Sequence, residues 1–283
     1  MTFPPPRVPV PEGAAPEAAA GLAAIAADPG RALIALDFDG TLAPIVSEPS
    51  AARPHPDVLP ALRRLATSVG TLAIITGRPA PVAVELGGFD DIPGLLVIGQ
   101  HGFERWEAGR LTSPPPPPEV TLARDRLPGI LARVGAPDGI RVEDKGHALV
   151  VHTRQAADPQ AALALLTAPL GEFAAEVGLD AKPGRLVIEL RPDGVNKGAA
   201  LTTLIAERDP AAVLFAGDDL GDLPAFEAVR AARAAGRAGV TVCSASDEVT
   251  ALAGHADLVV AGPAGVAALL VTLADAVARS RAR

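Results

Sequence analysis

The chain alternates short, wholly apolar runs with longer alanine-rich stretches. Runs such as "ALIAL" and "AVLFAG" have no polar residue at every second position, so both faces of each run are expected to be buried. Strands that are buried on both faces and separated by helices form a parallel sheet with helices on either side. The core is therefore predicted to be a doubly wound α/β fold. Its predicted strands lie at residues 32–37, 71–76, 95–99, 186–190, 212–217, 239–243 and 257–260.

The pattern changes between about residues 107 and 185. There "IRVEDKGHALVVHTR" contains two strand-like pieces in which charged and apolar residues mix, and stretches of helical character flank it. This block is predicted to be a separate α+β insertion. The predicted organisation is a flexible tail at residues 1–30 with room for one short alanine-rich helix, a core at 31–107 and 188–283, and a cap at 108–187.

Composition narrows the classes of protein. The chain has 283 residues, of which 33 are acidic and 25 basic, for a net charge of -8. A chain of this length can bury a sizeable core, and its acidic balance argues against a nucleic-acid-binding protein. The single cysteine, Cys243, excludes an internal disulfide, and its apolar surroundings in "GVTVCSA" favour a buried core position over a reactive thiol. A reducing, cytoplasmic location fits this composition.

No membrane segment is expected from the sequence. Residues 1–30 carry prolines where a signal peptide needs an unbroken apolar stretch. The most apolar late segment, "GVAALLVTLADAVARSRAR", is interrupted by Asp275 before it reaches membrane-spanning length. The stretch "SPPPPPE" at 113–119 is predicted to be a stiff surface linker.

Polar residues follow three of the apolar runs at their carboxyl ends. "ALIAL" is followed by Asp37, "TLAII" by Thr76 and "AVLFAG" by Asp218. Ligands of open α/β sheets bind at this edge, so these side chains are expected to meet at one site. Carboxylates about 4 to 5 Å apart repel by roughly 3–4 kcal/mol per pair at an effective dielectric near 20, which a cation would relieve. Oxygen ligands without a His or Cys cluster favour Mg²⁺ over zinc. The acidic residues of this predicted site are Asp37, Asp39, Asp218, Asp219 and Asp222.

Lys197 adds a positive charge to this site. Asn196 is predicted to cap a helix, which places Lys197 in the first turn, where the helix macrodipole disfavours a cation. A lysine in that position indicates an anion nearby, and a solvated surface lysine is the alternative. The alternative for Asp222 is a structural role as a helix cap. The alternatives for Thr76 and Arg78 are a strand-end hydroxyl and a surface charge.

Several motifs carry a family resemblance. "DFDGTLAP", "IITGR", "GVNKG" and "GDDLGD", in that order and spacing, resemble the four motifs of the haloacid dehalogenase (HAD) superfamily of phosphotransferases. With "GQHGFE", "VEDKGHALVVHTR", "IELRPDGVNKG" and "GDDLGDLPAF", they resemble the trehalose-6-phosphate phosphatases over nearly the whole chain after about residue 30. The resemblance implies a Rossmann-like HAD core and a cap domain that determines substrate specificity.

The resemblance also implies a role for each motif residue. Asp37 would be the nucleophile and Asp39 the general acid and base. As the acid Asp39 would carry a proton, a state that neighbouring carboxylates favour and Mg²⁺ opposes. Thr76 would donate a hydrogen bond to the phosphate, and Lys197 would neutralise the phosphate and steady Asp37. The implied Mg²⁺ site consists of the Asp37 and Asp218 carboxylates and the Asp39 backbone carbonyl, with Asp219 and Asp222 holding the ion or its waters. Asn196 stands where many relatives carry aspartate and is expected to cap the helix equally well.

Substrate recognition is expected to use charged groups. The chain has no tyrosine and a single tryptophan, Trp106, so aromatic platforms for a sugar are scarce. Arg185 stands where relatives commonly have lysine. The alternatives are a hydrogen-bonded core histidine for His101 and a solvated strand face for the cap residues. The substrate-binding residues implied by the resemblance are Arg78, His101 and Gly102 in the core and Glu143, Lys145, Arg154, Arg185 and Glu189 in the cap.

The function implied by the resemblance is Mg²⁺-dependent hydrolysis of trehalose 6-phosphate through an aspartyl-phosphate, the last step of trehalose biosynthesis. Functional coupling to a trehalose-6-phosphate synthase would follow, with no nucleic-acid or membrane partner. One alternative is an HAD phosphatase of another sugar phosphate, which would keep the core motifs. The other is a non-catalytic regulatory domain of a synthase complex, which would be expected to have lost an aspartate or the lysine; the chain retains all of them.

Overall fold

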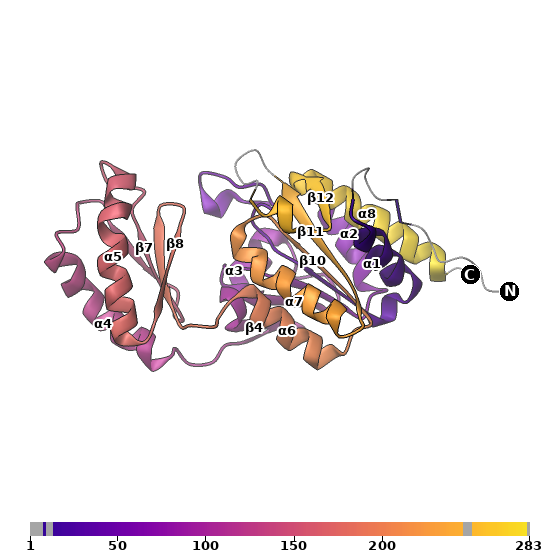
Figure 1. Ribbon diagram of the computed structural model, residues 1–283, viewed down its shortest axis with the longest axis horizontal. Helices are drawn as coiled ribbons and strands as arrows, with labels where there is room; N and C mark the ends of the chain where they lie inside the picture. Colours follow the sequence, from indigo (N-terminus) through magenta and orange to yellow (C-terminus); the bar gives the residue numbers. More distant parts are fainter. Residues whose placement is uncertain (1–7, 10–13, 246–250, 282–283) are drawn as a thin grey trace. The chain divides into compact units, whose positions relative to one another are not determined.

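The computed structural model describes residues 8–9, 14–245 and 251–281, and these residues form two sheets with their helices (Figure 1). The larger sheet has eight strands in the order β12-β11-β10-β1-β2-β3-β4-β5. The strands from β12 to β3 run parallel, whereas β4 and β5 each run antiparallel to the strand before them. The strands are β1 (Ala32–Leu36), β2 (Thr71–Ile75), β3 (Leu95–Gly99), β4 (Glu104–Glu107), β5 (Arg110–Thr112), β10 (Ala212–Gly217), β11 (Ala238–Ala245) and β12 (Leu258–Ala261).

Helices cover both faces of this sheet. One buried apolar cluster joins it to α1, α2, α3 and α8, and a second joins its other face to α6 and α7. This arrangement confirms the predicted doubly wound α/β fold. The helices are α1 (Pro16–Ala27), α2 (Val58–Ala66), α3 (Ala80–Gly87), α6 (Lys197–Arg208), α7 (Leu223–Ala234) and α8 (Gly262–Arg281). Short 3₁₀ helices are η1 (Pro29–Arg31), η2 (Pro49–Ala51), η3 (Gln100–Gly102), η4 (Leu220–Asp222) and η5 (Ala253–His255).

The chain reverses its direction of travel across the sheet at β1. From β1 it adds β2 and β3 on one side, and after the insertion it returns to the other side of β1 with β10. In open α/β sheets, the carboxyl ends of the strands at such a switch point form the ligand-binding crevice. The topology therefore indicates a ligand-binding site at the residues that follow β1, β2 and β10.

The insertion forms a unit of its own, with a four-stranded antiparallel sheet in the order β6-β7-β9-β8. Two helices pack on one face of this sheet, over a core that includes Leu149, Leu166 and Leu190. The elements of this unit, which we call the cap, are β6 (Arg141–Asp144), β7 (Leu149–His152), β8 (Asp180–Gly184), β9 (Val187–Arg191), α4 (Pro118–Arg133) and α5 (Pro159–Val177).

The boundaries of the cap differ from the predicted ones. The contacts divide the chain into Met1–Thr112 with Asn196–Arg283 and, separately, Ser113–Val195. The predicted boundary at residue 188 would cut through β9, which pairs with β7 and β8 in the cap sheet. The reason is visible in the side chains of β9, since Ile188 and Leu190 are buried in the cap core while Glu189 lies on the other face. This alternation is typical of a sheet covered on one face, unlike the uniform runs of the larger sheet.

Two terminal helices belong to the main core. Leu22 and Ile25 of α1 are fully buried in the same cluster as α2 and α8, so residues 16–27 are part of the core and not of a flexible tail. By length and composition alone, Gly262–Ser280 of α8 could cross a membrane. Leu270 and Leu273 of this helix nevertheless pack in the main cluster, as expected of a core helix.

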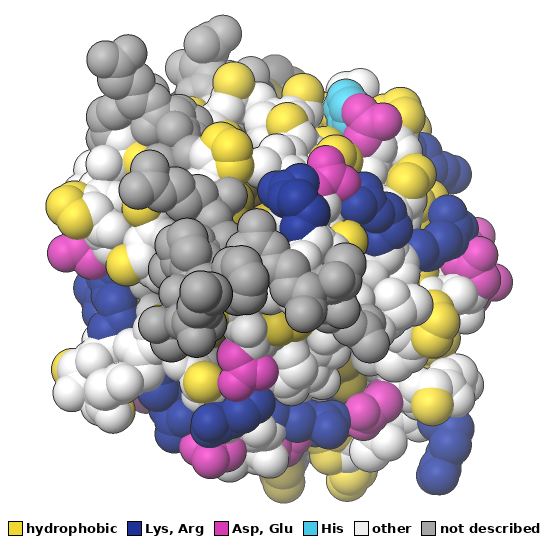
Figure 2. Space-filling view, turned by 90° about the vertical axis from the view of Figure 1, so that its right-hand side faces the viewer, with side chains coloured by type: hydrophobic (Ala, Val, Ile, Leu, Met, Phe, Trp, Pro, Cys, Tyr) yellow, Lys and Arg dark blue, Asp and Glu magenta, His cyan; other side chains and the backbone are white. Residues whose placement is uncertain are grey.

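Charges of both signs are interspersed on the surface. On the face shown in Figure 2, Lys and Arg side chains lie beside Asp and Glu side chains. Ion pairs of the larger unit, such as Arg63 with Asp91 and Arg64 with Asp275, show the same mixing. Among the residues that Figure 2 colours by type, basic side chains thus have acidic neighbours.

Candidate active site

The site lies where three neighbouring parallel strands end. Asp37, Thr76 and Asp218 each occupy the position directly after the last residue of β1, β2 or β10. All three are buried, with exposed fractions of 3%, 1% and 5%. The backbone N–H of Asp37 still donates to Ala216 on β10 at 2.9 Å, so the sheet itself fixes the position of this carboxylate. The structure thus brings together the strand-end residues that the sequence singles out.

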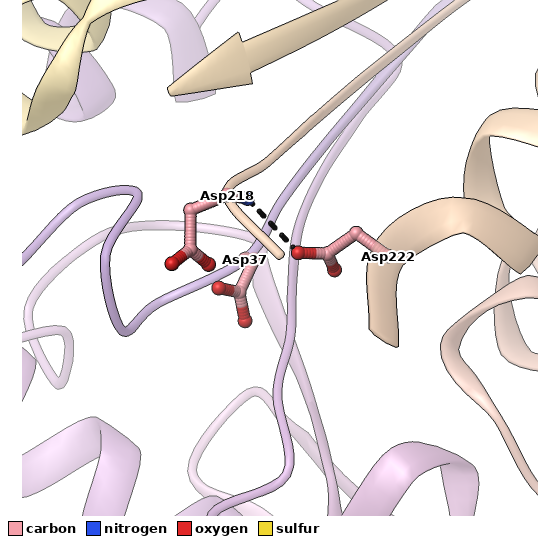
Figure 3. A group of neighbouring side chains, drawn as sticks. All are labelled: Asp37, Asp218 and Asp222. Carbon is pink, nitrogen blue, oxygen red and sulfur yellow. Dashed lines mark hydrogen bonds between the residues drawn. The ribbon is translucent and has the colours of Figure 1, made fainter. Parts of the chain in front are cut away.

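Three buried carboxylates form the centre of this site. Asp37, Asp218 and Asp222 each offer an oxygen atom within 4.8 Å of the others (Figure 3). Burial raises the pKa of Asp37 well above its usual range, and Asp222 and Asp218 add to the rise while Lys197 opposes it. Burial, together with Asp222 and Asp219, raises the pKa of Asp218 to about 7. Burial is the main cause of both shifts, and a cation bound between the carboxylates would favour their ionised forms.

Lys197 supplies one positive charge to the cluster. Its Nζ lies 2.6 Å from Asp37 Oδ1 and 2.7 Å from Asp222 Oδ1, and its side chain is only 8% exposed. Burial alone would lower its pKa, but Asp222 and Asp37 hold the pKa above its usual range. Lys197 is the first residue of α6, and Asn196 Oδ1 caps that helix by accepting from the Ala199 N–H at 2.9 Å. The predicted helix cap and the predicted anion contact of Lys197 are therefore both present, and a solvated lysine is excluded.

Asp222 connects the lysine to the loop after β10. Its Oδ2 accepts the backbone N–H of Asp218 at 3.0 Å, drawn as a dashed line in Figure 3, and that of Asp219 at 3.4 Å. Asp222 does not cap α7 with its side chain, although it precedes that helix. It closes a capping box with Asp219 around η4, and the Asp219 carboxylate accepts from the Gly221 N–H at 2.8 Å. Hydrogen bonds thus engage both oxygens of Asp222.

The loop after β1 approaches Asp218 very closely. Gly40 has a φ of 75°, and a Cβ atom at this position would come within 2.0 Å of Asp218 Oδ2. Its carbonyl accepts a 2.7 Å hydrogen bond from the buried Ser244 hydroxyl of β11. Thr41 Oγ1 donates to Asp37 Oδ2 at 3.3 Å. Local structure therefore explains both residues that follow the aspartates. Only glycine fits the backbone angle and the close approach at position 40, and Thr41 donates a hydrogen bond to Asp37.

Asp39 points to a different partner. Its two carboxylate oxygens accept from Arg78 Nε and Nη2, both at 2.7 Å, in a bidentate ion pair. The guanidinium also lies 5.5 Å from the centre of the Phe38 ring. Arg78 is predicted to bind substrate, but in this structure it holds Asp39. The carboxylates of Asp39 and Asp219 lie outside the buried cluster formed by the described residues.

A turn with unusual backbone angles borders the site. Gln100, His101 and Gly102 of η3 have φ values of 48°, 59° and 132°, and the first two are residues that rarely adopt a positive φ. The His101 ring lies against Gly77, where a Cβ atom would approach it to 2.8 Å. The His101 N–H donates to the carbonyl of Thr76 at 3.0 Å. His101 and Gly102 are thus beside the loop that follows β2.

The cap presents a charged face on the side of its sheet that no cap helix covers. Glu143, Val150 and Glu189 are paired across β6, β7 and β9, so their side chains share this face. Glu189 lies 3.5 Å from Lys145 Nζ, which brings the two predicted residues together. The pairs of this face also include His152 with Glu143 at 2.9 Å and Arg191 with Glu189 at 3.2 Å. Arg154 and Arg185 lie in turns after β7 and after β8.

Comparison with known proteins identifies the family. A sequence model described as trehalose-phosphatase matches residues 35–260, which is most of the chain. The chain belongs to the trehalose-phosphatase family. A trehalose-phosphate phosphatase of Mycobacterium marinum is 34% identical over 222 residues, or 70% of this chain and 52% of that protein. The trehalose-6-phosphate phosphatase of Escherichia coli is 33% identical over 199 residues, or 68% of this chain and 71% of that one.

A solved structure supports the same fold. The C-terminal domain of a Candida albicans trehalose-6-phosphate phosphatase superposes with a TM-score of 0.74, at 22% identity, over 90% of this chain and 95% of that one. The chain spans about half the length of the mycobacterial trehalose-phosphatases that it matches. The superposition agrees with an α/β core and a separate cap.

Sequence reasoning missed several residues of the core site and of the charged cap face. His152 and Arg191 lie on the charged cap face, and both stand in motifs used for the resemblance. Glu104 of "GQHGFE" is buried beside the loop that follows β2. A carboxylate that directly follows an apolar strand and a turn could have signalled a buried role for Glu104. The partners of these residues could not be predicted from the sequence, since they lie on other strands and loops that are distant along the chain.

Proposed function

We propose that the chain is a phosphatase that hydrolyses trehalose 6-phosphate to trehalose and inorganic phosphate with Mg²⁺. The observation that carries this proposal is the buried contact of Lys197 Nζ with Asp37 Oδ1 at 2.6 Å, beside Asp218. A carboxylate with an ammonium group on one side and a cation-binding acid on the other is suited to attack phosphorus, because phosphoryl transfer depends on alignment and charge neutralisation. Membership of the trehalose-phosphatase family supports the same reaction.

Asp37 acts as the nucleophile. Its carboxylate oxygen forms a bond to phosphorus while the bond from phosphorus to the sugar oxygen breaks, which leaves an aspartyl-phosphate. Water then attacks the same phosphorus, the bond to Asp37 breaks, and inorganic phosphate leaves. Lys197 balances charge on the phosphoryl oxygens, and the buried hydroxyl of Thr76, at the end of the neighbouring strand, donates a hydrogen bond to them.

Asp39 transfers the protons. It donates one to the departing sugar oxygen, which would otherwise leave as a strong base, and later accepts one from the attacking water. Each oxygen of Asp39 accepts one N–H group of Arg78, which leaves a second lone pair on each oxygen for the proton. We therefore assign Arg78 to the orientation of Asp39, and its predicted contact with the substrate stays part of this proposal.

The carboxylates fit a divalent cation. They offer only oxygen donors, and burial raises the pKa values of Asp37 and Asp218 although Lys197 contacts Asp37, so a divalent cation would favour the ionised forms of both. Asp37 and Asp218 would hold the ion with the Asp39 carbonyl. Asp222 and Asp219, whose oxygens accept backbone N–H groups, would keep the ligand loop in place. When bound, Mg²⁺ supplies charge neutralisation at the phosphoryl oxygens.

The cap face provides groups for a sugar. Glu143, Lys145 and Glu189 combine acceptors and donors on one face, as the hydroxyl groups of a second glucose ring require. Arg154 and Arg185, at the ends of cap strands, add two donors. His101 and Gly102 would contact the sugar next to the phosphate. These assignments favour a disaccharide phosphate over a monosaccharide phosphate.

The same proposal includes a cellular setting. The proposed substrate, trehalose 6-phosphate, must be supplied by an enzyme that synthesises it. We therefore propose functional coupling to a trehalose-6-phosphate synthase in the cytoplasm. The retained Asp37, Asp39 and Lys197 favour catalysis over the alternative of an inert regulatory domain. A phosphatase of another sugar phosphate remains the second candidate, since it would share every residue of the core site.

Phosphate release from a panel of sugar phosphates tests the proposal. Trehalose 6-phosphate should be hydrolysed with a kcat/KM at least about tenfold above that of glucose 6-phosphate, because only the disaccharide offers a second ring for the cap residues. Excess EDTA should abolish turnover, and added Mg²⁺ should restore it. Equal turnover of the two sugar phosphates would contradict the preference for trehalose 6-phosphate but not the phosphatase activity. If no phosphate ester is hydrolysed, the phosphatase activity itself is contradicted.

A further inference from the structure

We infer that Glu104 is a positioning residue that holds the general acid Asp39 through Gln100 and Arg78. Glu104 begins β4, and only 8% of its surface is exposed. Nothing in the proposed chemistry uses it, and its carboxylate accepts hydrogen bonds from Ala80 and Gln100 in the loops that follow β2 and β3. The inference rests on the proposed phosphatase activity but not on the identity of the sugar.

Glu104 joins two loops with its two oxygens. Oε2 accepts the backbone N–H of Ala80, the first residue of α3, at 2.6 Å. Oε1 accepts from Gln100 Nε2 at 2.7 Å. No side chain of its own segment caps α3, so Glu104 satisfies an N–H group that would otherwise lack a partner at that helix start. The loop that carries Arg78 is thus fixed at its far end.

Gln100 fixes the same loop closer to Arg78. Its backbone N–H donates to the Arg78 carbonyl at 2.9 Å, and the next N–H, that of His101, donates to the Thr76 carbonyl at 3.0 Å. Arg78 in turn holds both oxygens of Asp39. Hydrogen bonds therefore run without interruption from Glu104 through Gln100 and Arg78 to Asp39.

The turn at Gln100 is energetically unfavourable by itself. Gln100 and His101 both have positive φ values, which are unfavourable for residues other than glycine. Within the described part of the chain, Gln100 Oε1 is buried without a hydrogen-bond partner, which is a further cost. Strain of this kind persists where the surroundings enforce it, and here the Glu104 carboxylate is the group that holds the side chain.

The test uses a series of phenyl phosphates with leaving groups from p-nitrophenol to phenol. Glu104→Met removes both acceptors at similar side-chain length and should let Arg78 and Asp39 drift. Protonation by Asp39 matters little for a good leaving group and much for a poor one. We expect kcat/KM of Glu104→Met to fall about 10- to 100-fold with phenyl phosphate and less than about threefold with p-nitrophenyl phosphate.

Two variants separate positioning from general stability. Glu104→Gln should restore near wild-type behaviour, because the new amide can accept from Ala80 and donate to Gln100 Oε1 after that side chain turns its amide. Glu107→Met is the matched control, since Glu107 lies on the same strand and pairs with Arg105 and Arg208. It should change the melting temperature without changing the dependence on the leaving group. Equal losses of Glu104→Met on both esters would overturn the inference.

Amide hydrogen exchange provides a readout that does not depend on activity. Glu104→Met should speed exchange at Ala80, Gln100 and His101, whereas Glu107→Met should not. Unchanged exchange at these amides would also overturn the inference. A wild-type chain that hydrolyses none of the esters would contradict the proposed function instead.

Discussion

The two charged regions of this member of the trehalose-phosphatase family differ in how their charges are held. At the end of the large sheet, the side chains of Lys197, Asp37 and Asp222 are 8%, 4% and 0% exposed and contact one another directly. On the open face of the cap, Glu143 is 50% exposed and pairs with His152 across one strand pair. Removing one member of a buried pair leaves an uncompensated charge, whereas water screens an exposed one. A change of charge should therefore abolish turnover in the core, whereas in the cap it should lower the specificity for the sugar.

The largest expected effect is that of Asp37→Asn. Asparagine keeps the size of the side chain but removes the attacking carboxylate, so turnover should fall at least about 10³-fold. Lys197 keeps Asp222 as a partner, so the fold should persist. Phosphate release and the circular-dichroism spectrum measure the two quantities. Phosphate release at the wild-type rate would exclude a covalent intermediate on this residue.

A smaller and more selective effect is expected in the cap. Glu143→Ala should lower kcat/KM for trehalose 6-phosphate about 10- to 150-fold, from the loss of a charged hydrogen bond of about 1.5–3 kcal/mol, and Arg154→Ala should do the same. Neither variant should affect p-nitrophenyl phosphate. Asp144→Asn is the matched control, because Asp144 neighbours Glu143 on β6 but pairs with Arg124 of α4. A loss on both substrates alike, or an equal loss in the control, would contradict a sugar-binding role for this face.

The contrast between the regions also explains what the sequence could predict. The strands around Asp37, Thr76 and Asp218 were placed to within about a residue because their apolar runs are buried on both faces. β4 was missed because "ERWE" is mostly charged, and β9 was placed in the wrong unit because "VIEL" suits either kind of sheet. Propensity and period are local, whereas membership of a sheet is decided by the partner strand.

The site shows the same division. The sequence indicated the strand-end carboxylates and Lys197, since topology alone brings the carboxyl ends of β1 and β10 together. It did not indicate that Arg78 pairs with Asp39, or that Glu104 reaches Ala80. Those contacts depend on the conformations of loops. The positive φ values of Gln100 and His101, which the residue types do not favour, are part of these conformations.

Cation binding should depend on pH because of Asp218. Burial raises its pKa in the folded protein to about 7, from an ordinary value of 3.8, so the neutral form stabilises the cation-free fold at low pH, and this contribution disappears as the pH rises through 7. A divalent cation needs the ionised form, so protons compete with it below pH 7. Apparent Mg²⁺ affinity should fall by up to about tenfold per pH unit below 7, and the rise in melting temperature on adding Mg²⁺ should grow with pH.

Calorimetric titration with Mg²⁺ between about pH 6 and about pH 8, roughly one unit on either side of 7, measures this effect. Asp218→Asn is the control, since it should remove most of the affinity and with it the pH dependence. An affinity that stays constant across the range would show that Asp218 is already ionised without the cation.

The smallest expected effect compares two helix caps with the same chemistry. Asp158 Oδ1 accepts from the Ala161 N–H at 3.0 Å at the start of α5 in the cap, and Asn196 Oδ1 accepts from the Ala199 N–H at 2.9 Å at the start of α6 in the core. Replacing either residue by alanine should cost about 1 kcal/mol of unfolding free energy in its own unit. Only Asn196 precedes a residue of the buried cluster, so Asn196→Ala should also shift the Lys197 ammonium and lower kcat about two- to tenfold. Denaturant unfolding and p-nitrophenyl phosphate turnover measure both effects, and Asp158→Ala should leave turnover unchanged. If Asn196→Ala also leaves turnover unchanged, then Asp37 and Asp222 alone position the ammonium, and the first turn of α6 contributes to stability but not to the chemistry.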